Sequence, residues 1–210
     1  AYVVWHRQFV GDSDIRYYKI STGTQNVVDS SSNDDTTPKL SGTKIAFERN
    51  DVTPADADGI YFFNVDGGGS PVRVAAKGAA YSDSLAGIAG STVVWRRYYS
   101  ATSQADIFYD PDPTTFGSNV ISNNTDFDDS SVIVSDSSVA FTRNQSSADT
   151  FDGIYLFEFG SGTTTRITNT LSTSPVLSGI SGSNVAWYDN SSTGRYQVSL
   201  YSGGTIKQPS

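Results

Sequence analysis

A short pattern that recurs five times constrains the fold of this chain more than any other feature. Each copy places two β-branched or small apolar residues before an aromatic anchor and mostly polar residues after it. Consecutive anchors are 42, 48, 46 and 46 residues apart, and they are Trp5, Phe47, Trp95, Phe141 and Trp187. A period of this length matches the four-stranded blade of a β-propeller.

Each copy carries further signals of an antiparallel blade. Five residues before the anchor, where a tight hairpin turn favours a positive φ, stand Gly42, Gly90 and Gly182, with Asp136 in the fourth copy. Extended segments flank the turn, and no helical periodicity occurs. The sequence therefore predicts an all-β fold, a single five-bladed β-propeller of four-stranded antiparallel blades. The predicted domain spans residues 1–210, with blades at 1–29, 36–76, 84–122, 130–168 and 175–208.

The anchor strands are apolar on both faces, as is typical of strands packed between two other sheets. The residue before each anchor is small or medium-sized, for example Ala46 before Phe47. Large side chains of one blade would then interlock with small ones of the next. The alternative is an aromatic platform for stacking sugars, but an aromatic residue repeated in every blade favours a core role.

The repeat resembles that of the TolB-like β-propeller family. The matching segments are Gly42 with Ile45-Ala46-Phe47, Asp106-Ile107-Phe108, Asp152-Gly153-Ile154-Tyr155 and Arg166-Ile167-Thr168-Asn169. Ser41-Gly42 and Ser181-Gly182 are similar to a variant of the turn in repeats of bacterial and archaeal surface proteins. The resemblance covers essentially the whole chain and implies the propeller fold. It implies little about function, because such propellers serve many tasks.

Charged residues recur on both sides of one hairpin in each copy. An arginine follows four anchors by two residues, and an aspartate precedes the next strand in the same copies: Arg7 and Asp14, Arg49 and Asp58, Arg97 and Asp106, Arg143 and Asp152. We expect a salt bridge across the mouth of each hairpin. The fifth copy exchanges the two signs, with Asp189 and Arg195.

A second aspartate series begins the innermost strand, which lines the channel of a propeller. Asp35, Asp83 and Asp129 stand twelve residues before their anchors, and Asp34 and Asp128 lie beside two of them. Carboxylates that converge at a channel mouth would bind a polar ligand or Ca²⁺, and they could serve a glycoside hydrolase or lyase. Alternatively each aspartate caps its own turn by accepting backbone N–H groups, which the turn chemistry favours.

Other residue types that carry catalysis are scarce. His6 is the only histidine, and it lies in a repeated strand whose equivalent residues differ in every copy. The chain has no cysteine, so thiolate catalysis and thiolate metal sites are excluded. The two glutamates, Glu48 and Glu158, lie on strands away from the expected channel mouth. We therefore expect no cofactor, with Ca²⁺ as the one alternative. These residues favour a non-enzymatic role, and a glycoside hydrolase or lyase at the channel mouth stays the alternative.

Charge and composition limit the partners. The net charge of −8 repels phosphate, which disfavours nucleic acid and anionic membranes. No apolar run approaches the ~18 residues of a membrane helix. Few lysines and many Ser, Thr and Asn residues are typical of an extracellular, cell-surface or periplasmic protein. The sequence thus favours a binding or structural module that presents propeller loops to a protein or glycan partner.

The repeat register makes a prediction about the first blade. The first copy begins at Tyr2, already inside its anchor strand, and the chain ends at Ser210, where the fifth copy ends. We expect four complete blades and one three-stranded blade, 19 strands in all, with no sheet shared by the first and last blades. The edge of Val3–Arg7 would then have unpaired backbone groups unless another segment covers it.

Overall fold

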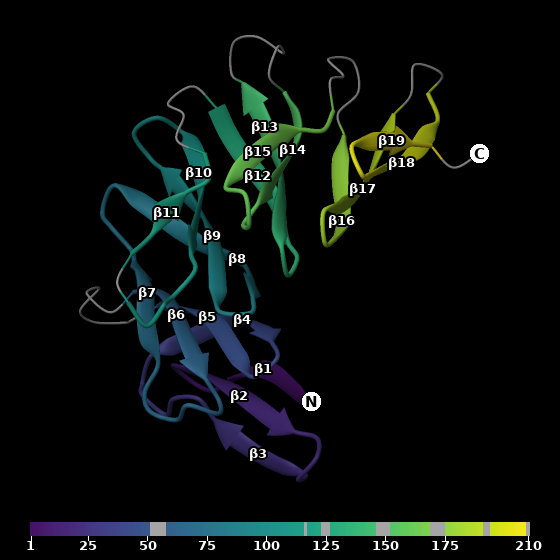
Figure 1. The fold of residues 1–210 in the computed structure, drawn as a ribbon. Coiled ribbons are helices and arrows are strands. Elements are labelled where there is room, and N and C mark those ends of the chain that lie inside the picture. Colours follow the sequence, from purple (N-terminus) through teal and green to yellow (C-terminus); the bar gives the residue numbers. More distant parts are fainter. Residues whose placement is uncertain are drawn as a thin grey trace. The chain divides into compact units, whose positions relative to one another are not determined.

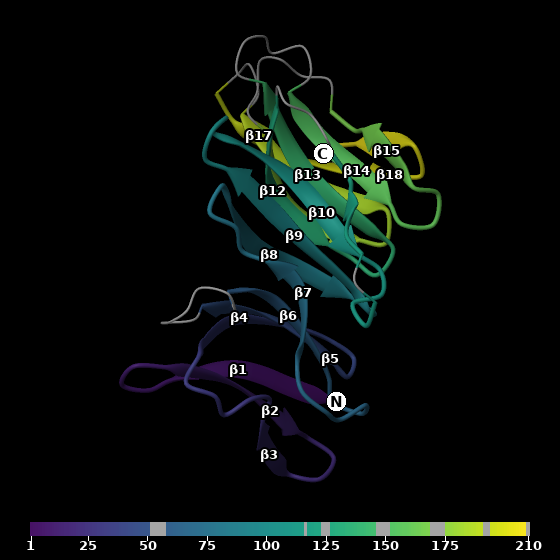
Figure 2. The same ribbon diagram turned by 90° about the vertical axis from the view of Figure 1, so that its left-hand side faces the viewer.

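The computed structural model describes residues 1–50, 58–115, 117–122, 127–145, 152–168, 175–190 and 194–208. These residues form the predicted 19 β-strands and no helix (Figures 1 and 2). The described part of the chain therefore contains no apolar helix of the length that a bilayer requires. The all-β prediction is confirmed.

The strands follow the five sequence copies. The first copy has three strands, β1 (Tyr2–Gln8), β2 (Ser13–Lys19) and β3 (Thr24–Val27). The second has β4 (Asp34–Ser41), β5 (Lys44–Asn50), β6 (Gly59–Asn64) and β7 (Val72–Ala76). The third has β8 (Tyr81–Ala89), β9 (Thr92–Tyr99), β10 (Gln104–Asp110) and β11 (Asn119–Val120). The fourth has β12 (Phe127–Val134), β13 (Ser138–Gln145), β14 (Gly153–Glu158) and β15 (Thr163–Arg166). The fifth has β16 (Val176–Ser181), β17 (Asn184–Asn190), β18 (Tyr196–Ser202) and β19 (Thr205–Lys207).

The last three copies each form a separate four-stranded sheet, as predicted. The first two copies depart from the prediction, because they share one seven-stranded mixed sheet with the order β1-β2-β4-β5-β6-β7 and β3 beside β2. One parallel bridge, Ser13 with Asp34, joins the two copies. Within the described residues β1 pairs only with β2, so the first copy has three strands and a free edge.

Among the described residues, the core that contains Trp95 and the core that contains Trp187 each lie between two consecutive sheets, whereas a third core, with Phe47, lies within the sheet of the first two copies. The chain divides into two compact units, Ala1–Ser100 with Phe108–Asn119, and Ala101–Ile107 with Val120–Ser210. In the first unit Ala46, the residue before one anchor, packs in the same core as Trp95, the next anchor. Ala140 and Trp187 repeat this arrangement in the second unit. The predicted interlocking of small and large side chains is therefore confirmed for these copies.

The burial of the anchors decides between their two interpretations. Phe47, Trp95 and Phe141 have no exposed surface, and Trp187 is 3% exposed. Rings this deeply buried cannot offer a face to a sugar, so the four anchors are core residues. Trp5, in the three-stranded first copy, is only half-buried.

Candidate functional site

Three arginine–aspartate pairs occupy equivalent places in consecutive copies. Each arginine donates from Nε to one carboxylate oxygen and from Nη2 to the other. The distances are 2.7 and 2.8 Å for Arg49 with Asp35, 2.7 and 2.7 Å for Arg97 with Asp83, and 2.8 and 3.0 Å for Arg143 with Asp129. This bidentate geometry gives the strongest form of hydrogen-bonded ion pair.

The strand register explains why these residues meet. The innermost strand of each copy runs antiparallel to the anchor strand, and each aspartate lies directly opposite its arginine. Residues directly opposite point to the same face of a sheet, with their Cβ atoms about 4.5–5.5 Å apart. The predicted pairing across the outer hairpin did not include this contact, because these arginines extend toward the innermost strand. In the first copy Arg7 lies directly opposite Asp14 on β2.

The aspartates of the outer hairpin have other partners where the structure shows them. Asp58 forms an ion pair of 3.2 Å with Lys77, and Asp14 forms one of 3.3 Å with Arg16. In the fifth copy Asp189 lies opposite Gln197 on β18 rather than opposite Arg195. The predicted exchange of signs therefore has no counterpart in the strand register.

Each of these three guanidinium groups also lies over an aromatic ring. Arg49 Cζ lies 4.4 Å from the centre of the Tyr61 ring, and Arg97 Cζ lies 4.0 Å from that of Tyr81. Arg143 Cζ lies 4.7 Å from the Tyr155 ring centre. A guanidinium within about 6 Å of a ring centre gains cation–π attraction. Each pair is therefore a unit of arginine, aspartate and aromatic ring.

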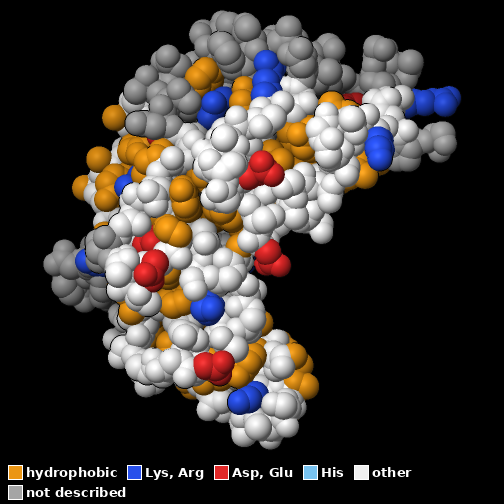
Figure 3. Space-filling model, in the orientation of Figure 1, with side chains coloured by type: hydrophobic (Ala, Val, Ile, Leu, Met, Phe, Trp, Pro, Cys, Tyr) orange, Lys and Arg blue, Asp and Glu red, His pale blue; other side chains and the backbone are white. Residues whose placement is uncertain are grey.

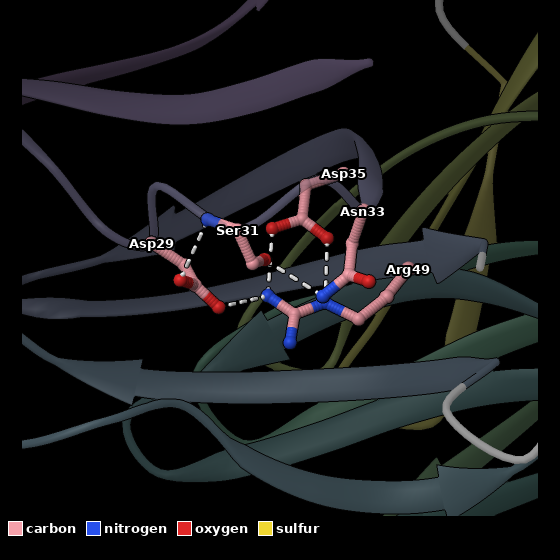
Figure 4. Close-up of polar contacts among 5 residues, drawn as sticks. All are labelled: Asp29, Ser31, Asn33, Asp35 and Arg49. Carbon is pink, nitrogen blue, oxygen red and sulfur yellow. Dashed lines mark hydrogen bonds and ion pairs between the residues drawn. The ribbon is translucent and has the colours of Figure 1, made fainter. Parts of the chain in front are cut away.

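The pair of the second copy has an additional carboxylate, which the sequence did not reveal. Arg49 Nη2 also donates to Asp29 at 2.7 Å (Figure 4). Asp29 in turn accepts the backbone N–H of Ser31 at 3.1 Å, and Asn33 donates to the Ser31 hydroxyl at 2.7 Å. The segment before β4 is thereby fastened to β5.

Burial and pairing act against each other in the protonation of these groups. Burial raises the pKa of the Asp35 and Asp83 carboxyls, and the arginine opposite each only partly offsets it. Burial also disfavours the charge of Arg97, but Asp83 outweighs that effect and raises the pKa of Arg97. Both partners thus carry a desolvation cost, which the bidentate contact has to offset.

This geometry bears directly on the predicted ligand site. Both oxygens of Asp35, Asp83 and Asp129 accept hydrogen bonds from arginine. Asp34 and Asp128 are half-buried, and each alternates in direction with its buried neighbour, as adjacent residues of a strand do. Within the described ranges, no three His, Asp or Glu side chains gather closely enough to hold a metal ion.

The remaining candidates for acid–base chemistry also have structural partners. Glu48 accepts the backbone N–H of Leu85 at 2.6 Å, and Glu158 accepts the Ser183 hydroxyl at 2.7 Å. His6 is exposed on β1, directly opposite Ile15. A nucleophile–base–carboxylate arrangement needs three such groups in contact. The structure places none of these three residues in one.

Comparison with known proteins concerns the fold of the chain. No family model matches the sequence, and no curated protein matches it. The β-propeller domain of the Trilobed protease from Pyrococcus furiosus aligns with 99% of the chain at 10% identity and a TM-score of 0.65. TolB from Acinetobacter baumannii aligns with 99% at 17% identity and a TM-score of 0.55. Dipeptidyl peptidase 4 from Porphyromonas gingivalis aligns with 93% at 13% identity and a TM-score of 0.68.

The chain spans less than two thirds of each of these structures: 65% of the Trilobed protease domain, 51% of TolB and 36% of dipeptidyl peptidase 4. At such identities the likeness concerns the fold alone. The repeat of four-stranded sheets, the interlocked cores and these alignments agree with one another. The chain has the β-propeller fold, which it shares with TolB and with the propeller domain of the Trilobed protease.

Proposed function

We propose that the chain is a non-enzymatic binding module of an exported or cell-surface protein, a five-bladed propeller that presents its hairpin loops to a protein partner. The tip of the β1–β2 hairpin is the observation that carries this proposal. Val10 is fully exposed and Phe9 is 39% exposed, side by side on the same turn. Neither side chain contributes to a described core, so folding does not account for them.

A backbone hydrogen bond closes the turn at this tip. The backbone N–H of Phe9 donates to the carbonyl of Asp12 at 2.8 Å, and Gly11 has the positive φ that this turn needs. The guanidinium carbons of Arg7 and Arg16 lie 4.8 and 5.7 Å from the centre of the Phe9 ring. A preorganised apolar residue with flanking arginines loses little entropy on binding and is typical of protein interfaces.

The engagement of the polar groups supports a binding role over an enzymatic one. Partners inside the fold engage Arg49, Arg97 and Arg143, the aspartates opposite them and both glutamates. On the face drawn in Figure 3, charged side chains of the described residues are scattered and do not form one patch of a single sign. Contacts to a partner would therefore depend on shape and apolar side chains at the loops.

Capture from the native source, run beside a glycan array, tests the proposal. We expect a protein to bind the chain, and Val10→Asp to abolish that binding. The matched control is Ile20→Asp, which alters an aliphatic residue that is 54% exposed at the opposite end of β2. Binding to glycans without a protein partner would overturn the choice of partner. Hydrolase turnover by the pure protein would overturn the non-enzymatic assignment.

A further inference from the structure

The two Asp–Pro bonds of the chain, Asp110–Pro111 and Asp112–Pro113, follow each other at the end of β10. The nitrogen of a proline carries no hydrogen and is bonded to three carbon atoms, so it takes up a proton and leaves more readily than other amide nitrogens. An aspartate side chain can attack its own main-chain carbonyl carbon through a five-membered ring, and such an intramolecular reaction is favoured. Both features make an Asp–Pro bond sensitive to acid.

Asp110 departs from the repeat at a buried position. In the first, second and fourth copies the third residue after the buried isoleucine of the same strand is aromatic: Tyr18, Phe63 and Phe157. In the third copy this residue is Asp110, which is only 2% exposed and has no cationic partner within the described residues. Burial of a carboxyl group without such a partner is costly. Folding therefore does not account for this aspartate.

The side chain of Asp110 is folded back along its own peptide bond to Pro111. Its Oδ1 accepts the backbone N–H of Asp112 at 3.0 Å, which closes a turn of side chain and main chain around Pro111. Its Oδ2 is buried and has no hydrogen-bond partner among the residues that the structure describes. One carboxyl oxygen is thus held in place, while the other is free to attack the main-chain carbonyl carbon of Asp110.

The surroundings of Asp110 favour the protonated form of its carboxyl. Burial raises its pKa, the charge of Asp112 raises it further, and the N–H groups of Asp112 and Gly117 offset this only partly. Asp112 is exposed, and hydrogen bonds from Thr114 hold its pKa below the ordinary value of 3.8. The proton that the leaving nitrogen needs is therefore available at Asp110 at a pH at which Asp112 is ionised.

We propose that the folded chain cleaves its own Asp110–Pro111 bond in mild acid, with the Asp110 carboxyl as both nucleophile and proton donor. A carboxyl oxygen bonds to the main-chain carbonyl carbon of Asp110, the bond from that carbon to the Pro111 nitrogen breaks, and the carboxyl proton passes to the nitrogen. Water then opens the cyclic anhydride, which leaves Asp110 with two free carboxyl groups and Pro111 with a free amino group. This event occurs once per chain, so it is not turnover of a substrate, and it does not depend on the binding partner proposed above.

Hydrogen bonds on both sides of the bond would hold the two fragments together after cleavage. β10 and β11 flank the bond and are neighbours in one sheet. The backbone N–H of Ile121 donates to the carbonyl of Ile107 at 2.8 Å, and the N–H of Ile107 donates to the Ser122 hydroxyl at 3.0 Å. Pro111 itself is exposed. Cleavage would therefore create two chain ends in the loop without removing a strand, and its products become visible only after denaturation.

Intact-mass spectrometry after incubation of the folded chain at about pH 5 and about 37 °C tests the proposal. We expect fragments 1–110 and 111–210 to form about tenfold or more faster than fragments 1–112 and 113–210. The Asp112–Pro113 bond is the matched control, because Asp112 Oδ1 likewise accepts the N–H two residues later, that of Thr114. In urea that unfolds the chain, both carboxyls have ordinary pKa values, and the two rates should agree within about twofold.

A trapping reagent and one variant test the chemistry of the step. Hydroxylamine should convert the anhydride into a hydroxamate on Asp110, which direct attack by water on the peptide bond would not produce. Pro111→Ala changes an exposed residue and keeps the carboxyl, and it should slow cleavage about tenfold or more because an ordinary amide nitrogen leaves less readily. Raising the pH to about 8 should stop cleavage, since the carboxyl then loses its proton.

Four results would overturn the proposal, and none of them requires a variant to fold. The first is absence of fragment 1–110 from the folded chain at about pH 5. The second is equal cleavage at the two Asp–Pro bonds of the folded chain. The third is a preference for Asp110–Pro111 that persists unchanged in urea, which would assign it to local sequence rather than to the fold. The fourth is cleavage without any hydroxamate in the presence of hydroxylamine.

Discussion

The carboxylate of Glu48 accepts a hydrogen bond of 2.6 Å from the backbone N–H of Leu85, 37 residues later and in the next sheet. The contact is part-buried and joins the sheets of the second and third copies, and both residues belong to the first compact unit. Glu158 makes a comparable contact with Ser183 between the fourth and fifth copies. The two glutamates of the chain therefore connect consecutive blades.

Replacing Glu48 should loosen the junction at Leu85. We expect Glu48→Ala to lower the free energy of unfolding by about 1–3 kcal/mol, because it leaves a buried N–H without its acceptor. Glu48→Gln keeps an acceptor oxygen and should cost less than half as much. Urea unfolding measures both, and hydrogen exchange of the Leu85 amide locates the effect. Unchanged exchange of that amide in Glu48→Ala would contradict this role.

Removing only one partner of the Asp83–Arg97 pair should destabilise the fold strongly. The side chain of Asp83 is 1% exposed and that of Arg97 is 16% exposed. Asp83→Ala should cost about 3–5 kcal/mol in unfolding free energy, because it leaves the arginine charge without its carboxylate. The double variant Asp83→Leu with Arg97→Leu should cost less than either single alanine variant.

The half-buried neighbour Asp34 provides the control for that experiment. Asp34→Ala should change the unfolding free energy by no more than about 0.5 kcal/mol, as is usual away from buried networks. A double-mutant cycle on Asp83 and Arg97 isolates the coupling between them. A coupling energy near zero would show that burial of the surrounding residues, rather than the ion pair, stabilises this part of the blade.

The repeat made much of the fold predictable. Spacing of the aromatic anchors, together with Gly42, Gly90 and Gly182 at φ near 60°, predicted the strands and their turns. The patterning of Ala46 before Phe47 predicted how blades interlock. These features are local or periodic, so one sequence is sufficient to recognise them.

The partner of each repeated arginine was not predictable in the same way. Arg97 is 14 residues from Asp83 but only 9 from Asp106. The shorter separation in the sequence therefore favoured Asp106 as the predicted partner of Arg97. The register that brings Asp83 opposite Arg97 includes an irregularity between Leu85 and Gly87. In the equivalent segments Thr37 and Ser131 adopt positive φ, a conformation that their residue types do not signal.

The bridge between the first two copies and several site residues could not be predicted from the sequence either. The Ser13–Asp34 bridge that unites the first two copies comes from segments with no pairing signal. Asp29 belongs to the Arg49 cluster but has no counterpart in the other repeats, so periodicity could not identify it. Phe9 and Val10 were predictable only as part of a loop, because exposure depends on which neighbours pack around a side chain.

Gly59 should tolerate no side chain. Its φ is 155°, and a Cβ at this position would collide with the backbone carbonyl oxygen of Ala75 on β7. We expect Gly59→Ala to destabilise the chain by about 2–4 kcal/mol through strain and displacement of β7. The control is Gly160→Ala, where a Cβ would meet open space and φ is not positive. Thermal unfolding followed by circular dichroism compares the two, and equal midpoints would contradict the close approach of β6 and β7.

The contact between Asp29 and Arg49 should make stability depend on pH in a defined direction. Burial alone would raise the pKa of the Asp29 carboxyl, but the hydrogen bond and charge of Arg49, together with the Ser31 N–H, hold it below its ordinary value of 3.8. The pKa of Asp29 is lower in the folded than in the unfolded state. Its contribution to the free energy of unfolding is therefore fully present above pH 3.8 and disappears as pH falls through the folded pKa.

At pH 6, Asp29→Asn should therefore cost about 1 kcal/mol of unfolding free energy. Urea unfolding from about pH 6 to pH 2 should show the wild-type and variant curves converging at the acid end. Curves that stay parallel over this range would show that the Asp29 carboxylate does not stabilise the fold through its charge.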